Sequence, residues 1–385
     1  MKPELDKKAL EVLEYNDLGK WTRPAPDLYP HQWLWDSCFI AIGLRHHDVK
    51  RARTELISLF RGQWANGMMP HTIFFQDKHY HLPASFWESR LSPYAPEKVA
   101  TSGITQPPVL AIAIAKVGEK MKKADRLKFY KEIYPSLLDY HAWLYRERNP
   151  QARGLAILIH PWESGMDNNP AWVEAMHTHH KPWWISAIEW TRLDKVIERF
   201  RRDTRQVPPD ERSTTVDSLM LMNVVRRLRR KHYDTDRVLP HSHFIIEDLL
   251  FNSVLIRANE YLKEIAKEIG EKIPRDVLSS MNKAGKSLEE LWDEETKQYY
   301  PRMYVTGKLI KEPTIASLMP LYSKAITKKR AETLVKMLED KGMFGANYPV
   351  PSVPLNSKYF NHRKYWQGPT WVNTNWLIIE GLESY

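Results

Sequence analysis

Two carboxylates lie close together in a segment that contains a glycine and ends in a proline, residues 160–170 (HPWESGMDNNP). Glu163 and Asp167 share this segment with Trp162 and Gly165. Cleavage of a glycosidic bond needs a carboxylic acid that protonates the leaving oxygen and a second carboxylate across the sugar ring. Burial among aromatic rings raises the pKa of such an acid and keeps it protonated near neutrality. The alternative is that Asp167 only caps the short helix that follows, and the segment alone leaves both interpretations open.

Two further segments place aromatic rings beside polar side chains: residues 29–37 (YPHQWLWDS) and residues 365–371 (YWQGPTW). Trp33 and Asp36 share a face if they lie on a helix, so the ring could cover a sugar while the carboxylate accepts hydrogen bonds from its hydroxyls. A core tryptophan and an aspartate favoured by the helix dipole fit the same spacing equally well. The second segment suits a stacking platform at a helix that Gly-Pro opens, although core packing can account for one of its rings.

The other polar candidates are weaker. Gln106 offers a donor and an acceptor near the start of an expected helix, and His71 is either a site residue or a structural histidine. His177, His179 and His180 form a cluster that could bind a metal ion. No cysteine accompanies them and no carboxylate lies at a characteristic spacing, so we expect no metal and no cofactor.

The elements that must position these residues are helical nearly throughout, as the i, i+3/i+4 apolar spacing of residues 244–270 illustrates. The expected helices are 31–46, 49–63, 104–117, 122–147 (interrupted by Pro135), 170–176, 211–231, 244–269, 274–291, 314–322, 327–340 and 369–384. The expected strands form one small hairpin, 298–304 against 308–311 around Gly307. Because βαβ alternation and a fixed repeat are both missing, we expect an all-α barrel or solenoid of antiparallel helices.

Composition narrows the class of protein further. The 385 residues include 15 Trp, 18 Tyr and 11 Phe, and the net charge is +10. The basic stretches 199–205 and 226–231 lack interleaved aromatic residues, so we expect solvated surface there and no nucleic-acid partner. The longest apolar run, 109–115, is too short to span a membrane, and no signal-peptide pattern precedes it. The single Cys38 fits a reducing compartment, so we expect a cytoplasmic protein.

Taken together, eight segments resemble glycoside hydrolase family 63, and within it the small bacterial branch of mannosylglycerate and glucosylglycerate hydrolases. They occur in the family order and cover nearly the whole chain. The segments are YPHQWLWDS (29–37), MMPH (68–71), TSGITQPPV (101–109), HPWESGMDNNPAW (160–172), IEDLLFNSVLIRANEYL (246–262), LWDEETKQYYPR (291–302), NYPVPSVP (347–354) and YWQGPTW (365–371).

The resemblance implies a single (α/α)6-barrel domain over 1–385, inversion of the anomeric centre, and Asp167 as the general acid. It also implies that Glu163 and Gly165 shape the sugar pocket, and it leaves Gln367 beside the site where the family more often has Arg. The remaining residues that fall where the family binds substrate are Tyr29, Trp33, Asp36, Gln106, Trp162, Tyr365, Trp366 and Trp371.

Arg212 lies where the glycerate hydrolases of the family have an Arg-Pro-Thr-x-x-Asp-Tyr stretch. An arginine fork suits the carboxylate of glycerate. Here Ser213 replaces the proline and Ser218 the tyrosine, so the resemblance leaves the specificity for the leaving group open.

The resemblance also leads us to expect a missing C-terminal part. The family's general-base glutamate follows the YWxGP motif by some tens of residues, whereas this sequence stops at Tyr385. About eleven expected helices, against the twelve of the barrel, support the same expectation of a missing last helix. Glu380 and Glu383 lie inside the final helix and are poor substitutes for the base.

The sequence therefore predicts an inverting α-glycosidase that acts on a small α-glucoside or α-mannoside such as glucosylglycerate or mannosylglycerate. The basic net charge agrees with an anionic substrate. One alternative is an α-glucosidase acting on oligosaccharides. Another is a sugar-binding pseudoenzyme without a base. A homo-oligomer stays open.

Overall fold

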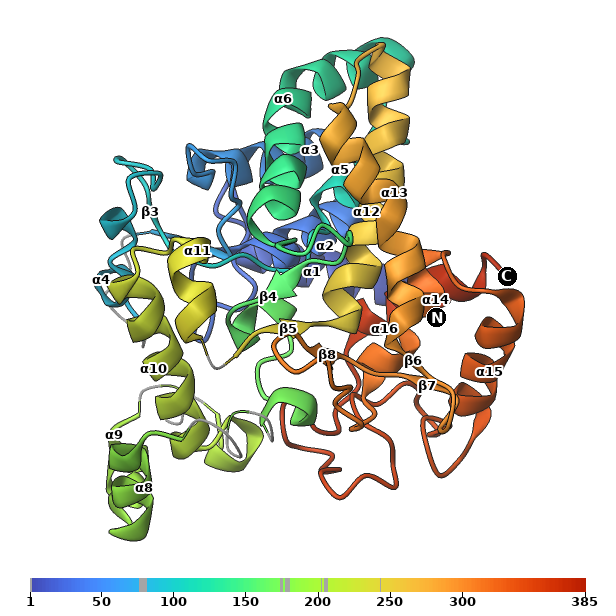
Figure 1. Ribbon diagram of the computed structural model, residues 1–385. Helices are drawn as coiled ribbons and strands as arrows, with labels where there is room; N and C mark the ends of the chain where they lie inside the picture. The colour runs from blue at the N-terminus through green and yellow to red at the C-terminus, as the bar shows by residue number, and fades with distance from the viewer. Residues whose placement is uncertain are drawn as a thin grey trace. The chain divides into compact units, whose positions relative to one another are not determined.

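The chain forms two compact units in the computed structural model, which describes residues 2–75, 82–173, 176, 181–201, 203, 207–242 and 244–385. The first unit comprises Met1–Arg146 and Ala258–Leu278, and the second comprises Glu147–Arg257 and Ser279–Tyr385. The chain passes between the units three times, at the end of helix α6 (Lys123–Glu147) and inside helices α12 (Leu249–Ile269) and α13 (Arg275–Leu288). Both units are mainly helical (Figure 1), as the apolar periodicity predicts.

The first unit consists of helices and one small antiparallel sheet. Its other helices and 3-10 turns are α1 (Lys2–Asn16), α2 (Leu34–Leu44), α3 (Val49–Leu59), η1 (Phe60–Gly62), α4 (Ala84–Trp87), η2 (Ser89–Leu91), α5 (Leu110–Gly118) and α6 (Lys123–Glu147). Its strands are β1 (Gln32–Trp33), β2 (Thr72–Phe74) and β3 (Ala100–Thr101), paired in the order β1-β2-β3. The register sets Trp33 opposite Thr72 and Ile73 opposite Thr101, which brings three expected site segments together.

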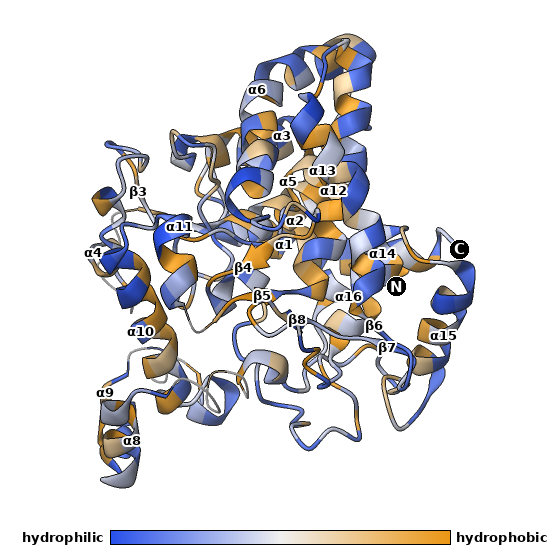
Figure 2. Cartoon of the chain, viewed as in Figure 1, coloured by the Kyte–Doolittle hydropathy of each residue, from blue (hydrophilic) through white to orange (hydrophobic). Residues whose placement is uncertain are grey.

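Helix α3 shows how local chemistry produces these elements. The Asp48 carboxylate accepts a hydrogen bond from the Arg51 amide (2.9 Å) and so caps the helix. Ala52, Leu56 and Leu59 then recur on one buried face. In α5 nearly every residue is buried, which accounts for its unbroken apolar run (Figure 2). No helix among the described residues is long and apolar enough to cross a membrane.

The second unit carries the longer connections. Its other helices and 3-10 turns are η3 (Pro161–Ser164), α8 (Trp183–Trp190), α9 (Leu193–Phe200), η5 (Pro209–Glu211), α10 (Thr215–Arg230), α11 (Thr235–Val238), η6 (Leu239–His241), η7 (Glu289–Leu291), η8 (Ile315–Leu318), α14 (Pro320–Ser323), α15 (Lys328–Glu339) and α16 (Val372–Leu382). Its strands are β4 (Ile157–Leu158), β5 (Ile246–Glu247), β6 (Trp292–Asp293), β7 (Gln298–Tyr299) and β8 (Arg302–Met303), in one three-stranded sheet, β4-β5-β8, and one pair, β6-β7.

The predicted hairpin is only partly correct. The chain turns back at Gly307, which has a left-handed φ of 68°, and the Met303 amide donates to the Lys308 carbonyl. Strand β7, however, pairs with β6, and β8 pairs with β5. The pattern of alternating residues marked the strands but not their partners. The partner of β8 lies far away in the sequence and leaves no local signal, whereas β6 lies only a few residues before β7 and was missed because both strands are two residues long.

Several predicted helix boundaries are wrong for identifiable reasons. The helix expected from residue 31 begins at Leu34, because residues 32–33 pair in the sheet as β1. The helix expected from residue 104 begins at Leu110, since Pro107 and Pro108 disfavour helical backbone before them. Helix α6 continues through Pro135 instead of breaking there. At 170–176, the described residues 170–173 are helical.

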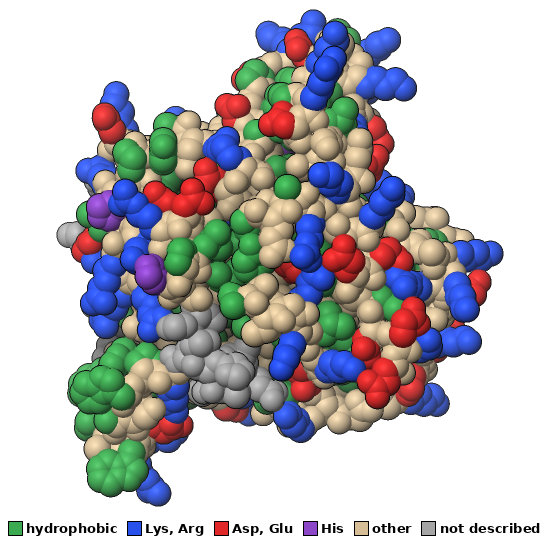
Figure 3. All heavy atoms as spheres, in the orientation of Figure 1, with side chains coloured by type: hydrophobic (Ala, Val, Ile, Leu, Met, Phe, Trp, Pro, Cys, Tyr) green, Lys and Arg blue, Asp and Glu red, His purple; other side chains and the backbone are tan. Residues whose placement is uncertain are grey.

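Five described α-helices escaped the sequence analysis: the single-turn α4 and α11, and the longer α1, α8 and α9. Helix α1 is largely exposed, so it lacks the strong apolar face on which such predictions depend. Helix α9 does have that spacing, in Leu193, Val196 and Phe200, but these side chains are exposed rather than buried. Figure 3 shows apolar side chains gathered where α8 and α9 lie, and Trp190 is 86% exposed.

Candidate active site

The second unit holds the turn that carries both carboxylates of the 160–170 segment. We refer to residues 160–169 as the acid turn. Strand β4 leads into it, η3 bends the chain, and Gly165 adopts a left-handed φ of 74°. The Ser164 hydroxyl accepts from the Met166 amide at 3.0 Å and donates to the Pro161 carbonyl at 2.6 Å. Gly165 is therefore required by the backbone of this turn, where an L side chain would be strained.

His160 holds the start of the acid turn. Its Nδ1 accepts from the Trp162 amide at 3.1 Å, so the ring proton lies on Nε2, which donates to the Leu221 carbonyl of α10 at 3.1 Å. Burial lowers the pKa of His160 to about 3. The imidazole is therefore neutral at working pH and acts as a fixed link between the turn and α10.

Glu163 is fully buried and faces away from solvent. Its carboxylate forms an ion pair with Arg148 (2.8 Å) and accepts from the Ile159 amide (2.8 Å). Both carboxylate oxygens are thus used to hold the acid turn. This geometry favours a structural role, and a direct sugar contact by Glu163 stays a prediction.

Asp167 has different surroundings, although it lies only four residues further along the same turn. Its side chain keeps partial exposure. Burial raises the pKa of Asp167 to about 6, against the opposing effects of the Arg212 charge and a hydrogen bond from the Tyr365 side chain. A carboxyl group of this pKa is partly protonated near neutrality, which is what a general acid requires.

The segment 365–371 is tied directly to the acid turn. The Trp366 amide donates to Asn168 Oδ1 (2.8 Å), and Gln367 Nε2 donates to the Asn168 carbonyl (2.7 Å). Gln367 is buried and so positions the residue next to Asp167. At Gly368 a Cβ would collide with the Asn361 carbonyl group, so no other residue fits there without rearrangement.

The aromatic rings of this segment form the cluster that their spacing suggests. The rings of Trp366 and Trp371 are stacked at 4.7 Å, and Tyr365 meets Trp371 edge-on at 5.5 Å. Trp366 is buried, whereas Tyr365 and Trp371 keep partial exposure. The rings of Tyr365 and Trp371 can therefore contact a ligand, and the buried Trp366 ring packs against Trp371.

Arg212 lies over the Tyr365 ring, with its guanidinium carbon 4.8 Å from the ring centroid. Its Nε is 3.5 Å from Asp203 Oδ2, and the same carboxylate accepts two hydrogen bonds from Arg201 (2.6 and 3.1 Å). The structure thus brings Arg212, Tyr365 and Asp167 together, from three separate segments of the chain.

The first unit gathers a second group of predicted residues at the entry to α2, which we define as residues 29–37. Tyr29 and Trp33 meet edge-on at 5.3 Å, and Asp36 lies in the first turn of α2 with partial exposure. The Gln106 side-chain oxygen accepts from the Trp35 amide at 3.3 Å, and the His71 carbonyl accepts from the Leu34 amide at 3.0 Å. Gln106 and His71 therefore hold the α2 entry in place.

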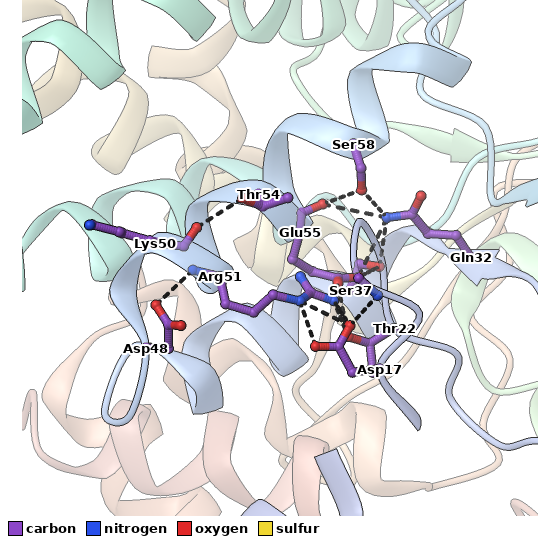
Figure 4. A network of polar contacts seen from close by, with 11 residues as sticks. Asp17, Thr22, Gln32, Ser37, Asp48, Lys50, Arg51, Thr54, Glu55 and Ser58 are labelled. Carbon is purple, nitrogen blue, oxygen red and sulfur yellow. Dashed lines mark hydrogen bonds and ion pairs between the residues drawn. The ribbon is translucent and has the colours of Figure 1, made fainter. Parts of the chain in front are cut away.

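A buried polar network that sequence reasoning missed supports the α2 entry (Figure 4). Glu55 is fully buried and accepts from the hydroxyls of Ser37 (2.5 Å) and Thr22 (2.9 Å) and from Arg51 (2.9 Å). Burial raises the pKa of Glu55, and the Ser37 and Arg51 contacts oppose that effect. The i, i+4 spacing of Arg51 and Glu55 was the available signal, but this spacing is more typical of exposed helix pairs.

Two further predicted features are Trp162 and the histidine cluster. Trp162 is half-buried, with its ring 4.6 Å from that of His160, so it lies on the acid turn but not against Asp167 by any contact described. The cluster of His177, His179 and His180 lies outside the described residues. Within the described parts of the chain, no three His, Cys, Asp or Glu side chains are grouped as a metal ion would need.

Comparison with known proteins gives the site its context. A family profile described as the mannosylglycerate hydrolase MGH1-like glycoside hydrolase domain matches residues 29–385. The mannosylglycerate hydrolase of Thermus thermophilus is 38% identical over 98% of this chain and 88% of its own length. The chain belongs to this glycoside hydrolase family. The predicted resemblance to family 63 is thereby confirmed, and the protein is a glycosidase.

Two more proteins are similar to this glycoside hydrolase, one in sequence and one in both sequence and structure. The glucosylglycerate hydrolase of Mycolicibacterium hassiacum is 32% identical, over 97% of this chain and 85% of its own length. The crystal structure of a family 63 mannosylglycerate hydrolase from Thermus thermophilus, in complex with Tris and D-glycerate, superimposes with a TM-score of 0.87. It is 36% identical, and the match covers 99% of this chain and 87% of that one.

Proposed function

We propose that this glycoside hydrolase cleaves glucosylglycerate or mannosylglycerate with inversion, and that Asp167 is its general acid. The observation that carries the proposal is the raised pKa of Asp167, about 6, beside an arginine and a tyrosine. The names of the similar enzymes, which are mannosylglycerate and glucosylglycerate hydrolases, support the choice of substrate.

In this mechanism the protonated Asp167 donates its proton to the glycosidic oxygen as the bond to the sugar breaks. The carboxylate that forms is then stabilised by the nearby Arg212 charge and by the hydrogen bond from Tyr365. Tyr365 and Trp371 provide aromatic faces for the sugar or the leaving group.

Inversion also needs a carboxylate that activates water, about 6.5–9.5 Å from the acid. Glu163 does not suit this role, since its two oxygens already bind Arg148 and the Ile159 amide. We assign the base to no residue here. Glu380, in α16, is not proposed for it either.

Arg212 is proposed to bind the glycerate carboxylate. It lies close enough to Asp167 to lower its pKa, so a carboxylate held by Arg212 would belong to the leaving group that Asp167 protonates. Ser213 and Ser218 follow it in the chain in place of the proline and tyrosine that the resemblance leads one to expect. An α-glucosidase that acts on oligosaccharides, in which Arg212 binds no substrate carboxylate, is therefore the second candidate function.

The proposal also includes the barrel fold, the sugar-binding residues, the location and the partners of the enzyme. We infer that the helices form one (α/α)6 barrel and that Tyr29, Trp33, Asp36 and Gln106 bind sugar. His71, Trp162 and Gly165 are likewise expected to bind substrate rather than to react. A cytoplasmic location, the lack of a nucleic-acid partner and a homo-oligomer stay predictions.

The experiment compares initial rates on glucosylglycerate, mannosylglycerate and a neutral disaccharide such as maltose. A glycerate hydrolase should prefer one of the first two in kcat/KM, and Arg212→Gln should reduce that preference by roughly 30-fold or more, as loss of a charge-pair partner implies. Equal rates on maltose, unaffected by Arg212→Gln, would support the α-glucosidase. Binding of the sugar without any turnover would support the pseudoenzyme.

A further inference from the structure

A cavity lies in the second unit along helix α10. It has a volume of about 340 Å³ and is lined by the C-terminal half of α10 and by the segment that contains α11 and η6. Arg227, on its wall, is twelve residues beyond Thr215, where α10 begins, so the helix rise separates them by about 18 Å. Arg212 precedes that helix, so the basic end of the cavity is distinct from the proposed catalytic site. The other end, at Met220, adjoins Leu221, whose carbonyl accepts a hydrogen bond from His160.

One side of the cavity is apolar. Met220, Val224 and Leu228 recur every four residues on α10 and form one stripe, which Val238 and Phe244 face from the following segment. Figure 2 shows apolar residues along this helix. Such a wall can accept a hydrocarbon group, and the volume is at the lower end of the range for small-molecule sites.

The other side of the cavity is basic. Arg227, Arg230 and Lys231 share a face of α10 beside the apolar stripe. None of the three forms an ion pair with a described residue, and no Asp or Glu is among the described residues of the lining. The partial negative charge at the C-terminus of α10 offsets only about half a unit of positive charge.

The sequence alone favoured a solvated helix face for residues 226–231. In the structure, some of these side chains are solvated and others line the cavity. Arg226 is exposed and does not line the cavity, whereas Arg227 and Lys231 are half-buried at its edge. Two like charges at i, i+4 repel each other, and a bound anion would remove that repulsion. Asn223 and Ser242 add hydrogen-bonding groups on the same wall.

We propose that this cavity binds a small amphipathic anion, an apolar body that carries one carboxylate or phosphate group. The apolar stripe receives the hydrocarbon part, and Arg227 and Lys231 bind the anionic group. Because the headgroup could belong to a fatty acid or to a phosphorylated metabolite, octanoate and octyl phosphate serve as separate probes. 1-Octanol, which has the same chain without a charge, is the neutral probe.

The test is calorimetric titration of the full chain with each probe. Octanoate or octyl phosphate should bind saturably, with a stoichiometry of one, and at least tenfold more tightly than 1-octanol. Arg227→Gln should weaken the preferred anion at least fivefold. Arg226→Gln removes the same charge from the same helix without touching the cavity, and it should change the affinity less than twofold.

A second variant locates the ligand. Val224→Trp should fill the apolar side and abolish binding of all probes, while thermal unfolding and glycosidase rate show that the chain is still folded. If that variant fails to fold, the difference in anion affinity between Arg227→Gln and Arg226→Gln decides whether the anion binds in the cavity. Equal losses in those two variants, 1-octanol binding as tightly as the anions, or the absence of saturable binding at millimolar probe would each overturn the proposal.

Discussion

The acid turn and the α2 entry are each held by a buried ion pair between a glutamate and an arginine. Each also carries one aspartate, Asp167 or Asp36, and the two aspartates lie in different surroundings. In each region a fully buried glutamate pairs with an arginine on the inner side: Glu163 with Arg148, and Glu55 with Arg51. In the α2 entry, the other carboxylate is Asp36 in the first turn of a helix, where negative charge is favoured. Asp167 instead precedes the helical residues 170–173. Burial raises its pKa to about 6, although Arg212 and Tyr365 oppose that rise.

This difference suggests how the two candidate carboxylates acquire different roles. A carboxylate in the first turn of a helix suits a residue that accepts hydrogen bonds from sugar hydroxyls, as proposed for Asp36. A carboxyl group whose ionisation is disfavoured suits a proton donor, as proposed for Asp167. The buried Glu163 and Glu55 hold the two segments in place. They thereby keep Asp167 and Asp36 in their different surroundings.

The largest expected effect comes from Asp167→Asn. Loss of the general acid should lower kcat on a glycerate glycoside by roughly 10²–10⁴-fold. On a dinitrophenyl glycoside the loss should be small, because that leaving group departs without a proton. Asp36→Asn is the matched variant, and it should lower kcat/KM on both substrates to a similar extent. Equal losses on both substrates in Asp167→Asn would make Asp167 a binding residue like Asp36.

Glu163→Gln should act on folding rather than on chemistry. Removal of one partner of the buried ion pair with Arg148 should cost about 3–5 kcal/mol in the free energy of unfolding, measured with urea. The double change Arg148→Met and Glu163→Leu should recover much of that stability. A Glu163→Gln protein as stable as the wild type but inactive would indicate a direct contact with the sugar.

Asp167→Asn should also stabilise the protein, by an amount that grows from pH 3.8 upward and is complete above about pH 6. A native pKa raised from 3.8 to about 6 means that the folded state loses stability as pH rises through that interval. The variant should therefore gain up to about 3 kcal/mol at pH 8 and almost nothing at pH 3.5. A gain that is the same at both pH values would show that the effect is one of packing.

The smallest expected effect is that of Gln367→Met, which tests the link between the 365–371 segment and the acid turn. It removes the hydrogen bond to the Asn168 carbonyl and should cost about 1–2 kcal/mol of stability. Because Asn168 is next to Asp167, kcat should fall as well while KM changes little. An unchanged kcat would mean that the backbone of the turn is held without this contact.

The sequence predicted the parts of this protein that depend on local pattern. Helical periodicity located α3, α12 and α15, and the spacing of Trp162, Glu163 and Asp167 indicated glycosidase chemistry. The spacing alone could not distinguish the roles of Glu163 and Asp167, which only the resemblance assigned, since the physical distinction rests on Arg148 and Arg212 outside the segment. The strand partner of β8 and the contacts of Glu55 with Ser37 and Thr22 were missed for the same reason, because they join residues far apart in the chain.

The central claim is that Asp167 donates the proton, and the pH dependence of kcat/KM on a glycerate glycoside tests it most directly. The acid must be protonated in the free enzyme, so kcat/KM should decline as pH rises through about 6, tenfold for each further pH unit. A kcat/KM that stays constant from pH 5 to pH 8, where the protein is still folded, would contradict the assignment of Asp167 as the general acid.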